Sequence, residues 1–582
     1  MEILWEHPGD IQSSQRVADV AESLNISPVI AAILLNRGLN SADEIQAFFT
    51  PSLKDLQDPM QMADMAKAVD TLIGALTDRR RIVVYGDYDV DGVTSVSLLY
   101  LVLKDLGGRV SYRIPERQND GYGLSETAIG ECWAQGDRLL VTVDTGITAV
   151  DQIRYARELG MDVIICDHHR PGDELPNANA ILNPKVESCG YPFRELAAVG
   201  VAFKLVQALS DRLQLDDGLA FRYLDLAALG SAADIVPLLG ENRILVSLGL
   251  DKLNTQPLTG IRALLDVASP QGREVDVSQI IFGLAPRINA VGRMGNAERA
   301  VELLTTKNRS RAREIAQVLE EENCARKCID QGTLSEALLK VEQEVDLVND
   351  RVIVLAQREW HCGVIGIVAS RIIEKYHRPT VLISVDEHGV GKGSARSIPG
   401  FDIYSALNEN KELLEQFGGH MYAAGLTIRE EVIPEFARRL KEYCANNLSE
   451  QDLLPRLVLA AEIPLAEINR QFVETLARFA PHGPRNPKPL FLTRDVQICS
   501  VVRQVGNGHL HVRLQKGGYE FETIGYGLGR LEPEIANLEL LDIVYSVEDN
   551  VWQGRRSIQL HLKDICRAGA RRMESQPVSR AV

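Results

Sequence analysis

The feature that most constrains this fold is an alternation of short β-branched runs with helical patterns between residues 81 and 182. Strand-like runs lie at 81–85, 110–114, 139–143 and 163–166, and segments with helical spacing lie at 96–104, 126–134 and 149–159. Strands that alternate with helices in this way build βαβ units, whose strands run parallel. The sequence therefore predicts an α/β fold class, with a mostly parallel sheet in this part of the chain.

Carboxylates and imidazoles follow three of these strands directly. They are Asp87, Asp89 and Asp91 after the first strand, Asp144 after the third, and Asp167, His168 and His169 after the fourth. The carboxyl ends of parallel strands meet at one edge of a sheet, where open α/β sheets bind their ligands. We therefore expect these side chains to gather at one edge, although a single member such as Asp144 could equally well cap a helix.

The triple-carboxylate loop at residues 87–91 indicates a divalent metal site, because carboxylates this close repel one another unless a cation lies among them. A solvated acidic turn and an EF-hand loop are the alternatives. In EF-hand register the three aspartates and Gly92 fit, but position twelve is Leu98, where a bidentate glutamate is required. The EF-hand interpretation therefore fails.

Asp234 is a further candidate ligand. It lies among small and apolar residues within 230–237, where an unpaired charge would be costly. It is paired, caps a helix or binds a metal, and the sequence leaves these three interpretations open.

The composition is that of an ordinary globular protein, with 45% hydrophobic and 25% charged residues over 582 positions, a length that suits about four domains. The net charge of −17 argues against a protein that coats nucleic acid through bulk positive charge, but it leaves room for a local basic channel. The nine cysteines are scattered, the first residues lack the pattern of a signal peptide, and no apolar run approaches the ~18 residues of a membrane span. We expect a cytoplasmic protein with no membrane partner.

Patterns of charge, apolar spacing and turn residues divide the rest of the chain into segments. A long, highly charged helical pattern suits a bridge between two globular parts, and five short strands between glycine and asparagine turns suit a small OB-like β-barrel. The predicted segments are an N-terminal helical segment at 1–80, the α/β domain at 81–300, the bridging helix at 301–347, a second, smaller α/β domain at 348–450, the barrel at 451–566 and a disordered tail at 567–582.

Three further segments carry polar side chains. Residues 286–293 hold two arginines with little secondary-structure signal, so we expect an ordinary loop there. Residues 391–397 are not a Walker loop, because Lys392 is followed by glycine, but their small residues with Ser394 and Arg396 suit a backbone that approaches an anion. His420 is the polar residue of a tight segment, and a lone histidine is more often structural than catalytic.

Together, the acidic loop and the segments 143–146, 167–169 and 233–234 resemble the four motifs of the DHH phosphoesterase family. The segments 287–289, 393–397 and 418–425 resemble further motifs of that family, including those of its DHHA1-type second domain. From about residue 25 to 565 the chain is similar to one branch of this family, the bacterial exonucleases that degrade single-stranded DNA from 5′ to 3′.

The resemblance implies a centre of two divalent ions, Mn²⁺ or Mg²⁺, which suits hard carboxylate oxygens with one imidazole. Asp89 and Asp91 would each favour one ion, Asp144 would bridge both, Asp87 would help to hold the first, and His168 and Asp234 would complete the second. Asp167 would orient a ligand without binding metal, and His169 would contact the scissile phosphate or steady the site. The implied DNA-phosphate contacts are Arg287, Asn289, Ser394, Arg396 and His420.

The implied activity is hydrolysis of single-stranded DNA with release of 5′-mononucleotides, in recombination and repair. Single-stranded DNA would be the substrate, and a single-strand-binding protein and a helicase would be partners. The alternative is a DHH phosphodiesterase for short oligoribonucleotides or cyclic dinucleotides, whose usual architecture lacks the barrel. A degenerate DNA-binding scaffold would have lost its carboxylates, and a family II pyrophosphatase would leave the Gly-Gly-His motif unexplained.

Overall fold

The computed structural model describes residues 3–7, 14–115, 123–215, 218–268, 274–294, 297–552, 555–570 and 573–575. The chain divides into two compact units. Unit 1 contains residues 1–10, 324–469 and 489–582, and unit 2 contains residues 11–323 and 470–488. The chain therefore passes between the units four times.

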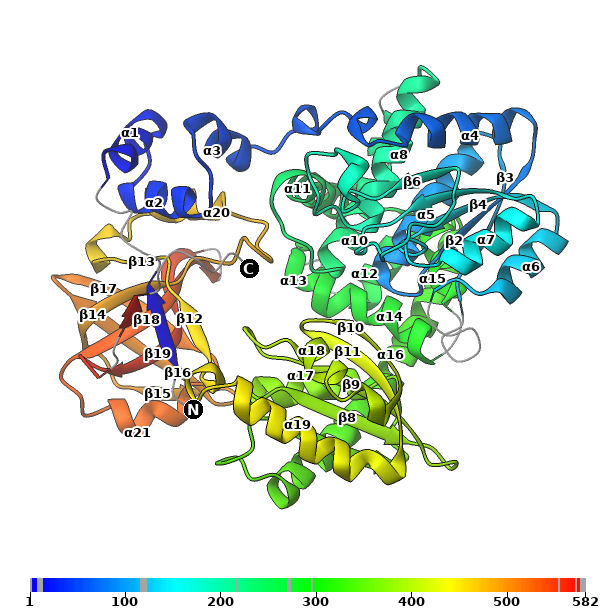
Figure 1. Ribbon diagram of the computed structural model, residues 1–582. Helices are drawn as coiled ribbons and strands as arrows, with labels where there is room; N and C mark the ends of the chain where they lie inside the picture. The colour runs from blue at the N-terminus through cyan, green and yellow to red at the C-terminus, as the bar shows by residue number, and fades with distance from the viewer. Residues whose placement is uncertain are drawn as a thin grey trace. The chain divides into compact units, whose positions relative to one another are not determined.

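A five-stranded parallel sheet forms the centre of unit 2, in the order β3-β2-β4-β5-β6 (Figure 1). Its strands are β2 (Arg81–Gly86), β3 (Arg109–Arg113), β4 (Asp137–Val143), β5 (Asp162–Cys166) and β6 (Ala180–Leu182). The helices between them are α5 (Val90–Asp105), α6 (Glu126–Ala134) and α7 (Val150–Glu158). The predicted parallel sheet is confirmed, and β6 escaped prediction because three residues show no periodicity.

Side chains alternate along these strands and are buried on both faces of the sheet. Ile82 and Val84 pack in one core with α5, with α4 (Met65–Thr77) and with α8 (Ala198–Arg212). Val83 and Tyr85 pack in a second core with α6 and α7. Burial on both faces explains why β2, β4 and β5 are largely apolar runs in the sequence.

The remaining helices of unit 2 include one at a segment where the sequence pattern predicts a loop. They are α1 (Gln15–Leu24), α2 (Pro28–Asn36), α3 (Ala42–Phe49), α9 (Gly218–Phe221), α10 (Leu224–Ala233), α11 (Gly240–Thr255), α12 (Thr259–Ala268), α13 (Val277–Gln279), α14 (Ala285–Met294) and α15 (Glu298–Thr305). The expected loop at 286–293 was wrong, because α14 follows a π-helical turn, η4 (Ile280–Leu284). Pro286 lies in its first turn, where a missing N–H costs no helical hydrogen bond.

Residues 470–488 lie within the predicted barrel segment of the sequence but pack in unit 2. They begin with α20 (Arg470–Ala477), and the loop after it is held by Arg243, which is only 3% exposed. Its guanidinium donates hydrogen bonds to the carbonyl oxygens of Phe48, Arg478, Phe479, Ala480 and Pro481. The rings of Phe48, Phe49 and Phe479 pack beside it with centroids 5.8–5.9 Å apart.

Unit 1 contains the predicted second, smaller α/β sheet, in the order β10-β11-β9-β8-β7. Its strands are β7 (Ile353–Arg358), β8 (Thr380–Val385), β9 (Val390–Arg396), β10 (Leu414–His420) and β11 (Ala423–Arg429). β7 and β8 run parallel, and the other neighbours run antiparallel. One face packs with α17 (Ile365–Tyr376), and the other packs with α18 (Ile403–Asn408) and α19 (Ile433–Asn447).

The predicted barrel is also present in unit 1. It contains β13 (Ala461–Glu462), β14 (Phe491–Ile498), β15 (Arg503–Val505), β16 (His509–Lys516), β17 (Tyr519–Gly525), β18 (Leu541–Trp552) and β19 (Arg555–Arg567). The order is β13-β14-β18-β19-β17-β16-β15, and an additional pairing of β14 with β16 closes the sheet. Beside it, β1 (Leu4–His7) pairs with β12 (Arg456–Val458) and β20 (Met573–Ser575). The predicted disordered tail thus includes β20, while residues 571–572 and 576–582 lie outside the described residues.

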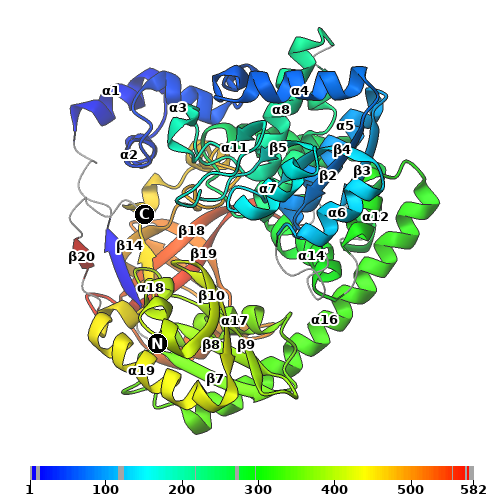
Figure 2. The same ribbon diagram turned by 45° about the vertical axis from the view of Figure 1, so that its right-hand side comes forward.

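The predicted bridging helix is α16 (Arg309–Glu344), one unbroken helix that begins in unit 2 and ends in unit 1 (Figure 2). Among the described residues, no single helix has the length and apolar character to cross a membrane. The consecutive helices α1 and α2 meet those criteria only when taken together, with a bend of 112° between them.

Candidate metal centre

The acidic loop after β2 is shaped by the start of α5. Asp89 is the N-cap of this helix, and its side chain accepts a hydrogen bond from the Gly92 backbone N–H at 3.0 Å. A Cβ atom at Gly92 would lie 2.4 Å from the Asp87 carbonyl oxygen, so glycine is required for the chain to fold back this closely. The cap and the glycine together bring Asp87, Asp89 and Asp91 to the end of β2.

The neighbouring strands add further polar groups at the same edge. Asp144 follows β4 with a φ of 58°, in the left-handed region that residues other than glycine rarely adopt. Its N–H donates to the Cys166 carbonyl oxygen at 3.0 Å, which ties it to the end of β5, and His168 and His169 come next after that strand. The structure therefore brings together the strand-end residues that the sequence singled out.

Asp234 reaches this edge from outside the sheet, as the C-cap residue of α10. Its Oδ2 atom lies 3.6 Å from His168 Nε2. The same nitrogen lies 3.2 Å from Asp144 Oδ1 and 3.9 Å from Asp91 Oδ2. Three carboxylates that are far apart in the sequence thus meet around one imidazole.

Three groups of side chains each place their ligand atoms within 4.8 Å of one another. They are Asp87 with Asp89 and Asp144, Asp91 with His168 and Asp234, and Asp144 with His168 and His169. Asp144 and His168 each belong to two groups, so the groups form one continuous cluster. Such a cluster of hard oxygens with imidazole nitrogen suits Mn²⁺ or Mg²⁺.

Burial and mutual repulsion disfavour the charged forms of the innermost carboxylates. Burial, with repulsion from Asp89, raises the pKa of Asp91 to about 7 against the pull of two backbone N–H groups at the start of α8. Burial and the neighbouring aspartates raise the pKa of Asp144 and that of Asp234 well above their usual values. Divalent cations among these groups would remove the repulsion, so the residues present fit a metal centre.

The surroundings of the two imidazoles shift their pKa values in opposite directions. Burial lowers the pKa of His168 to about 3, so this ring is neutral and can offer a lone pair to a metal. Burial also favours a lower pKa for His169. The 2.8 Å hydrogen bond between His169 and Asp167 outweighs burial, however, so the pKa of His169 is raised. For Asp167, burial is outweighed by His169 and by the Ile147 N–H, and the pKa falls to about 2. Asp167 therefore orients His169 and favours its protonated form.

The predicted phosphate contacts of unit 2 lie on α14. A Cβ atom at Gly292 of this helix would lie 2.8 Å from the Tyr88 carbonyl oxygen, so α14 packs directly against the acidic loop. Arg287 forms an ion pair with Glu320 and donates to the Gly283 carbonyl oxygen at 2.6 Å. The Asn289 Oδ1 atom is buried. Arg287 is thus engaged within the protein, and its contact with phosphate stays a prediction.

The other predicted phosphate contacts belong to unit 1. Arg396 Nη1 donates to Ser394 Oγ at 2.9 Å, and both side chains lie against the first turn of α17, where a Cβ atom at Gly366 would be 2.7–2.8 Å from them. A helix N-terminus beside an arginine favours an anion. His420 ends β10, next to its hairpin partner β11. Their binding to DNA also stays a prediction.

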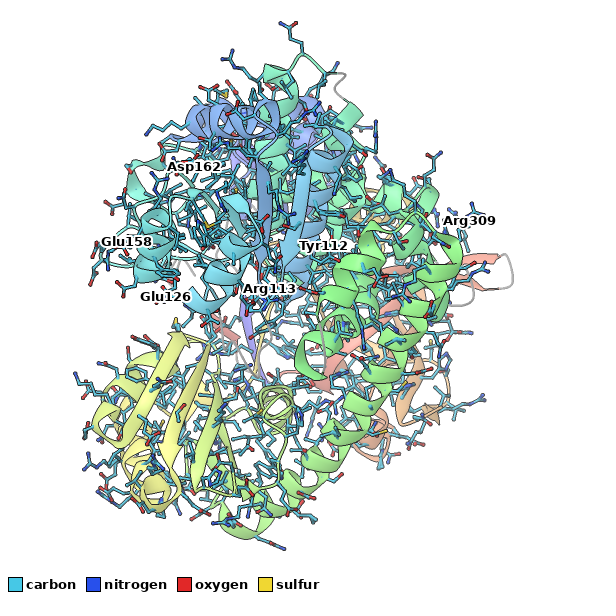
Figure 3. All side chains as sticks on the ribbon, turned by 90° about the vertical axis from the view of Figure 1, so that its right-hand side faces the viewer. Tyr112, Arg113, Glu126, Glu158, Asp162 and Arg309 are labelled. Atoms are coloured by element: carbon cyan, nitrogen blue, oxygen red, sulfur yellow. The ribbon has the colours of Figure 1, made fainter. Side chains whose placement is uncertain are left out.

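Two cations that follow or end strands of the sheet were missed by sequence reasoning, and one of them, Lys185, acts on the pKa of Asp234. Arg113 ends β3, beside Tyr112 (Figure 3), and its Nη2 lies 3.3 Å from Glu131 Oε2. The strand-end rule could have found it, because a strand was predicted there. Lys185 follows β6, and its charge opposes the effect of burial on the pKa of Asp234. No sequence signal marked it, because β6 itself gave none.

Comparison with known proteins decides the family. Three family models match the chain: the N-terminal domain of the DHH family at residues 81–231, the DHHA1 domain at 349–446 and the RecJ OB domain at 459–564. The single-stranded-DNA-specific exonuclease RecJ of Bacillus subtilis is 38% identical over 552 residues, which are 94% of this chain and 69% of that protein. This chain belongs to the RecJ family.

Other RecJ proteins also match nearly the whole of this chain. The RecJ exonuclease of Escherichia coli is 35% identical over 579 residues, which cover 95% of this chain and 99% of that protein. Among solved structures, RecJ from Thermus thermophilus in complex with Mn²⁺ matches with a TM-score of 0.83 and 30% identity, over 98% of this chain and 80% of that one. The predicted resemblance and fold class are confirmed.

Proposed function

We propose that this chain is a metal-dependent exonuclease that degrades single-stranded DNA from its 5′ end, releases 5′-mononucleotides and acts in recombination and repair. The observation that carries the proposal is the carboxylate and imidazole cluster at the carboxyl edge of the sheet, whose three overlapping groups each place their ligand atoms within 4.8 Å of one another. It occurs in a chain that matches RecJ exonucleases over 94% and 95% of its length. Solved RecJ structures contain Mn²⁺ or Mg²⁺.

The cofactors are two divalent ions, Mn²⁺ or Mg²⁺. In our assignment, Asp87 and Asp89 would hold one ion, and Asp91, His168 and Asp234 would hold the other. Asp144 would contribute to both, because it shares a ligand group with Asp87 and Asp89 and lies 3.2 Å from His168 of the second group. When bound, such a pair lowers the pKa of water and neutralises charge on the attacking and leaving oxygens. Asp144 has a left-handed backbone, with a φ of 58°, at this position.

The remaining polar residues orient the substrate in this proposal. His169, held by Asp167 in a form that favours a proton, donates a hydrogen bond toward the scissile phosphate. Ser394, Arg396, Asn289 and His420 are our candidates for further phosphate contacts. Arg287 is another candidate, and it has to exchange its ion pair with Glu320 for the phosphate.

The test is digestion of a single strand of DNA that carries a label at either the 5′ or the 3′ end, with Mn²⁺ present. We expect a 5′-labelled strand to release labelled mononucleotide at once, while the 3′ label stays on shortening strands. Retention of the 5′ label with loss from the 3′ end would contradict the proposed polarity. An RNA strand of the same sequence and short oligoribonucleotides in the same assay test the alternative phosphodiesterase activity.

A matched pair of variants tests the metal ligands. Asp144→Asn removes a charge but keeps a residue type that tolerates the left-handed backbone, so cleavage should fall to background while the protein stays folded. Asp137→Asn is the control, because Asp137 is equally buried at the opposite end of the same strand, where it pairs with Arg81 at 3.1 Å. Near-normal turnover by Asp144→Asn would overturn the metal assignment.

We place this activity in the cytoplasm, with a single-strand-binding protein and a helicase as partners that supply unwound DNA. All nine cysteines are free, as expected in a reducing compartment.

A further inference from the structure

Ile235 combines a strained backbone conformation with an exposed side chain, and neither feature stabilises the fold. It follows the candidate ligand Asp234 directly, it has a φ of 59°, and 59% of its surface is exposed. It lies one residue past the C-cap of α10, at the position where helices favour glycine in the left-handed conformation. A β-branched side chain is strained in this conformation, and an exposed isoleucine recovers little free energy by burial. Glycine or asparagine would therefore stabilise unit 2 better than isoleucine does.

The surrounding chain holds this strained turn from both sides. On one side, the Asp234 N–H donates to the Gly230 carbonyl oxygen at 2.9 Å, within the last turn of α10. On the other side, the fully buried Asn242 donates to the Pro237 carbonyl oxygen at 3.1 Å. Strain that is held by its surroundings in this way is typical of functional sites.

The strained residue lies beside the metal centre. Its chain neighbour Asp234 places Oδ2 3.6 Å from His168 Nε2. In the described part of unit 2 the exposed large apolar residues are Met60, Trp133, Leu175, Ile235 and Phe282. Of these, Ile235 alone adjoins a candidate metal ligand in the chain. It is therefore an exposed apolar residue next in the chain to a ligand of a site that is otherwise built of carboxylates and imidazoles.

We propose that Ile235 is a specificity-determining residue that packs against the sugar of the nucleotide whose phosphate is cleaved, and that it favours deoxyribose over ribose. The inference rests on the proposed exonuclease function. The metals and the cationic side chains account for the phosphate, and the C–H groups of the sugar are an apolar surface that every nucleotide shares. Ile235 offers no hydrogen bond to a 2′-hydroxyl, which would lose water on contact with it. An apolar surface of this kind discriminates against one added hydroxyl by about 10- to 100-fold.

The test compares two substrates and three variants. The substrates are a single strand of DNA and the same strand with one ribonucleotide at its 5′ end. The variants are Ile235→Ala, which removes apolar surface, Ile235→Asn, which adds a polar group and suits the left-handed backbone, and Leu339→Ala as the control. Leu339 is 57% exposed on α16, which matches the exposure of Ile235.

The parent should prefer the all-DNA strand by at least about tenfold in kcat/KM. Ile235→Ala should reduce this preference to about twofold, mainly through KM, Ile235→Asn should abolish it, and Leu339→Ala should leave it unchanged. An unchanged preference in both Ile235 variants would overturn the inference. If the parent degrades no single-stranded DNA at all, the proposed function itself fails.

Two measurements without turnover separate this role from a structural one. In the metal-free protein, Ile235→Asn should raise the unfolding temperature of unit 2, because it relieves backbone strain. Mn²⁺ affinity, measured by calorimetry, should stay within about twofold of the parent in Ile235→Ala. Lower stability of Ile235→Asn, or a loss of Mn²⁺ affinity in proportion to the loss of activity, would show that Ile235 acts through packing or through Asp234, and would overturn the proposed sugar contact.

Discussion

Replacement of Asp91 by asparagine should change how the stability of the metal-free protein depends on pH. Burial, with repulsion from Asp89, raises the pKa of Asp91 from 3.8 to about 7. The folded state thus binds this proton more tightly than the unfolded state does, so the free energy of unfolding falls as the pH rises from about 4 to about 7. Each pKa unit corresponds to about 1.4 kcal/mol, and Asp91 therefore costs the folded protein about 4 kcal/mol above pH 7.

The asparagine variant avoids this cost but loses one contact. The Asp91 carboxylate accepts the backbone N–H groups of Ala198 at 2.7 Å and Val199 at 2.9 Å, and an amide can accept only one of them. A buried donor left without a partner costs about 1–3 kcal/mol. We therefore expect Asp91→Asn to be more stable than the parent by about 1–3 kcal/mol at pH 8, and no more stable than the parent at pH 4.

The assay is urea unfolding in EDTA at several pH values, with hydrogen exchange of peptides from unit 2 as the readout. With a slope of about 3 kcal/mol per M, the parent midpoint should be about 1 M lower at pH 8 than at pH 5. Saturating Mn²⁺ should reverse the order of parent and variant, since each ion at 100 times its Kd adds about 2.7 kcal/mol to the parent. A parent midpoint that does not change between pH 5 and pH 8 would refute the reasoning.

Three further substitutions test separate parts of the structure. Gly92→Ala should abolish Mn²⁺ binding measured by calorimetry, because its Cβ atom would lie 2.4 Å from backbone in the acidic loop; unchanged affinity would contradict the close approach. Asp167→Asn should lower the pKa of His169, so that the alkaline limb of the activity profile moves to lower pH; an unmoved limb would exclude a role for protonated His169. Tyr526→Ala should weaken binding of long single strands by about 1–3 kcal/mol while dinucleotide hydrolysis is retained. The reason is that this tyrosine is 56% exposed between two histidine rings on the barrel, where a base can stack on it. Equal losses on both substrates would count against base stacking.

The gathering of the candidate metal ligands at one edge of the sheet was largely predictable because most of them share a local signature. The strands β2, β4 and β5 are short, largely apolar runs, and the residue type that follows each of them can be read directly from the sequence. Parallel topology then brings strand ends such as Asp87 and Asp144 to one edge without further information. Asp234 comes from a helix end, and the sequence could only present it as one of three possibilities.

The features that escaped prediction depend on contacts between distant residues. The helix at 285–294 begins after a π-helical turn whose packing is tertiary, and β6 has three residues. Arg243 meets four of its five carbonyl partners more than 230 residues further along the chain, where no periodicity could indicate them. The strain at Ile235 is a backbone angle, and an isoleucine in the sequence gives no sign of it.

The return of residues 470–488 to unit 2 sets the limits within which this protein can be shortened. A chain that ends near residue 450, at the domain boundary that the sequence predicts, would lack four of the five carbonyl acceptors of Arg243. A buried guanidinium that loses its acceptors lowers the free energy of unfolding by about 3–5 kcal/mol. It would also uncover Phe48 and Phe49, whose rings pack on Phe479. Fragments that end at that boundary should aggregate. A shortened nuclease therefore has to retain this segment, joined to the rest of unit 2 by a new linker.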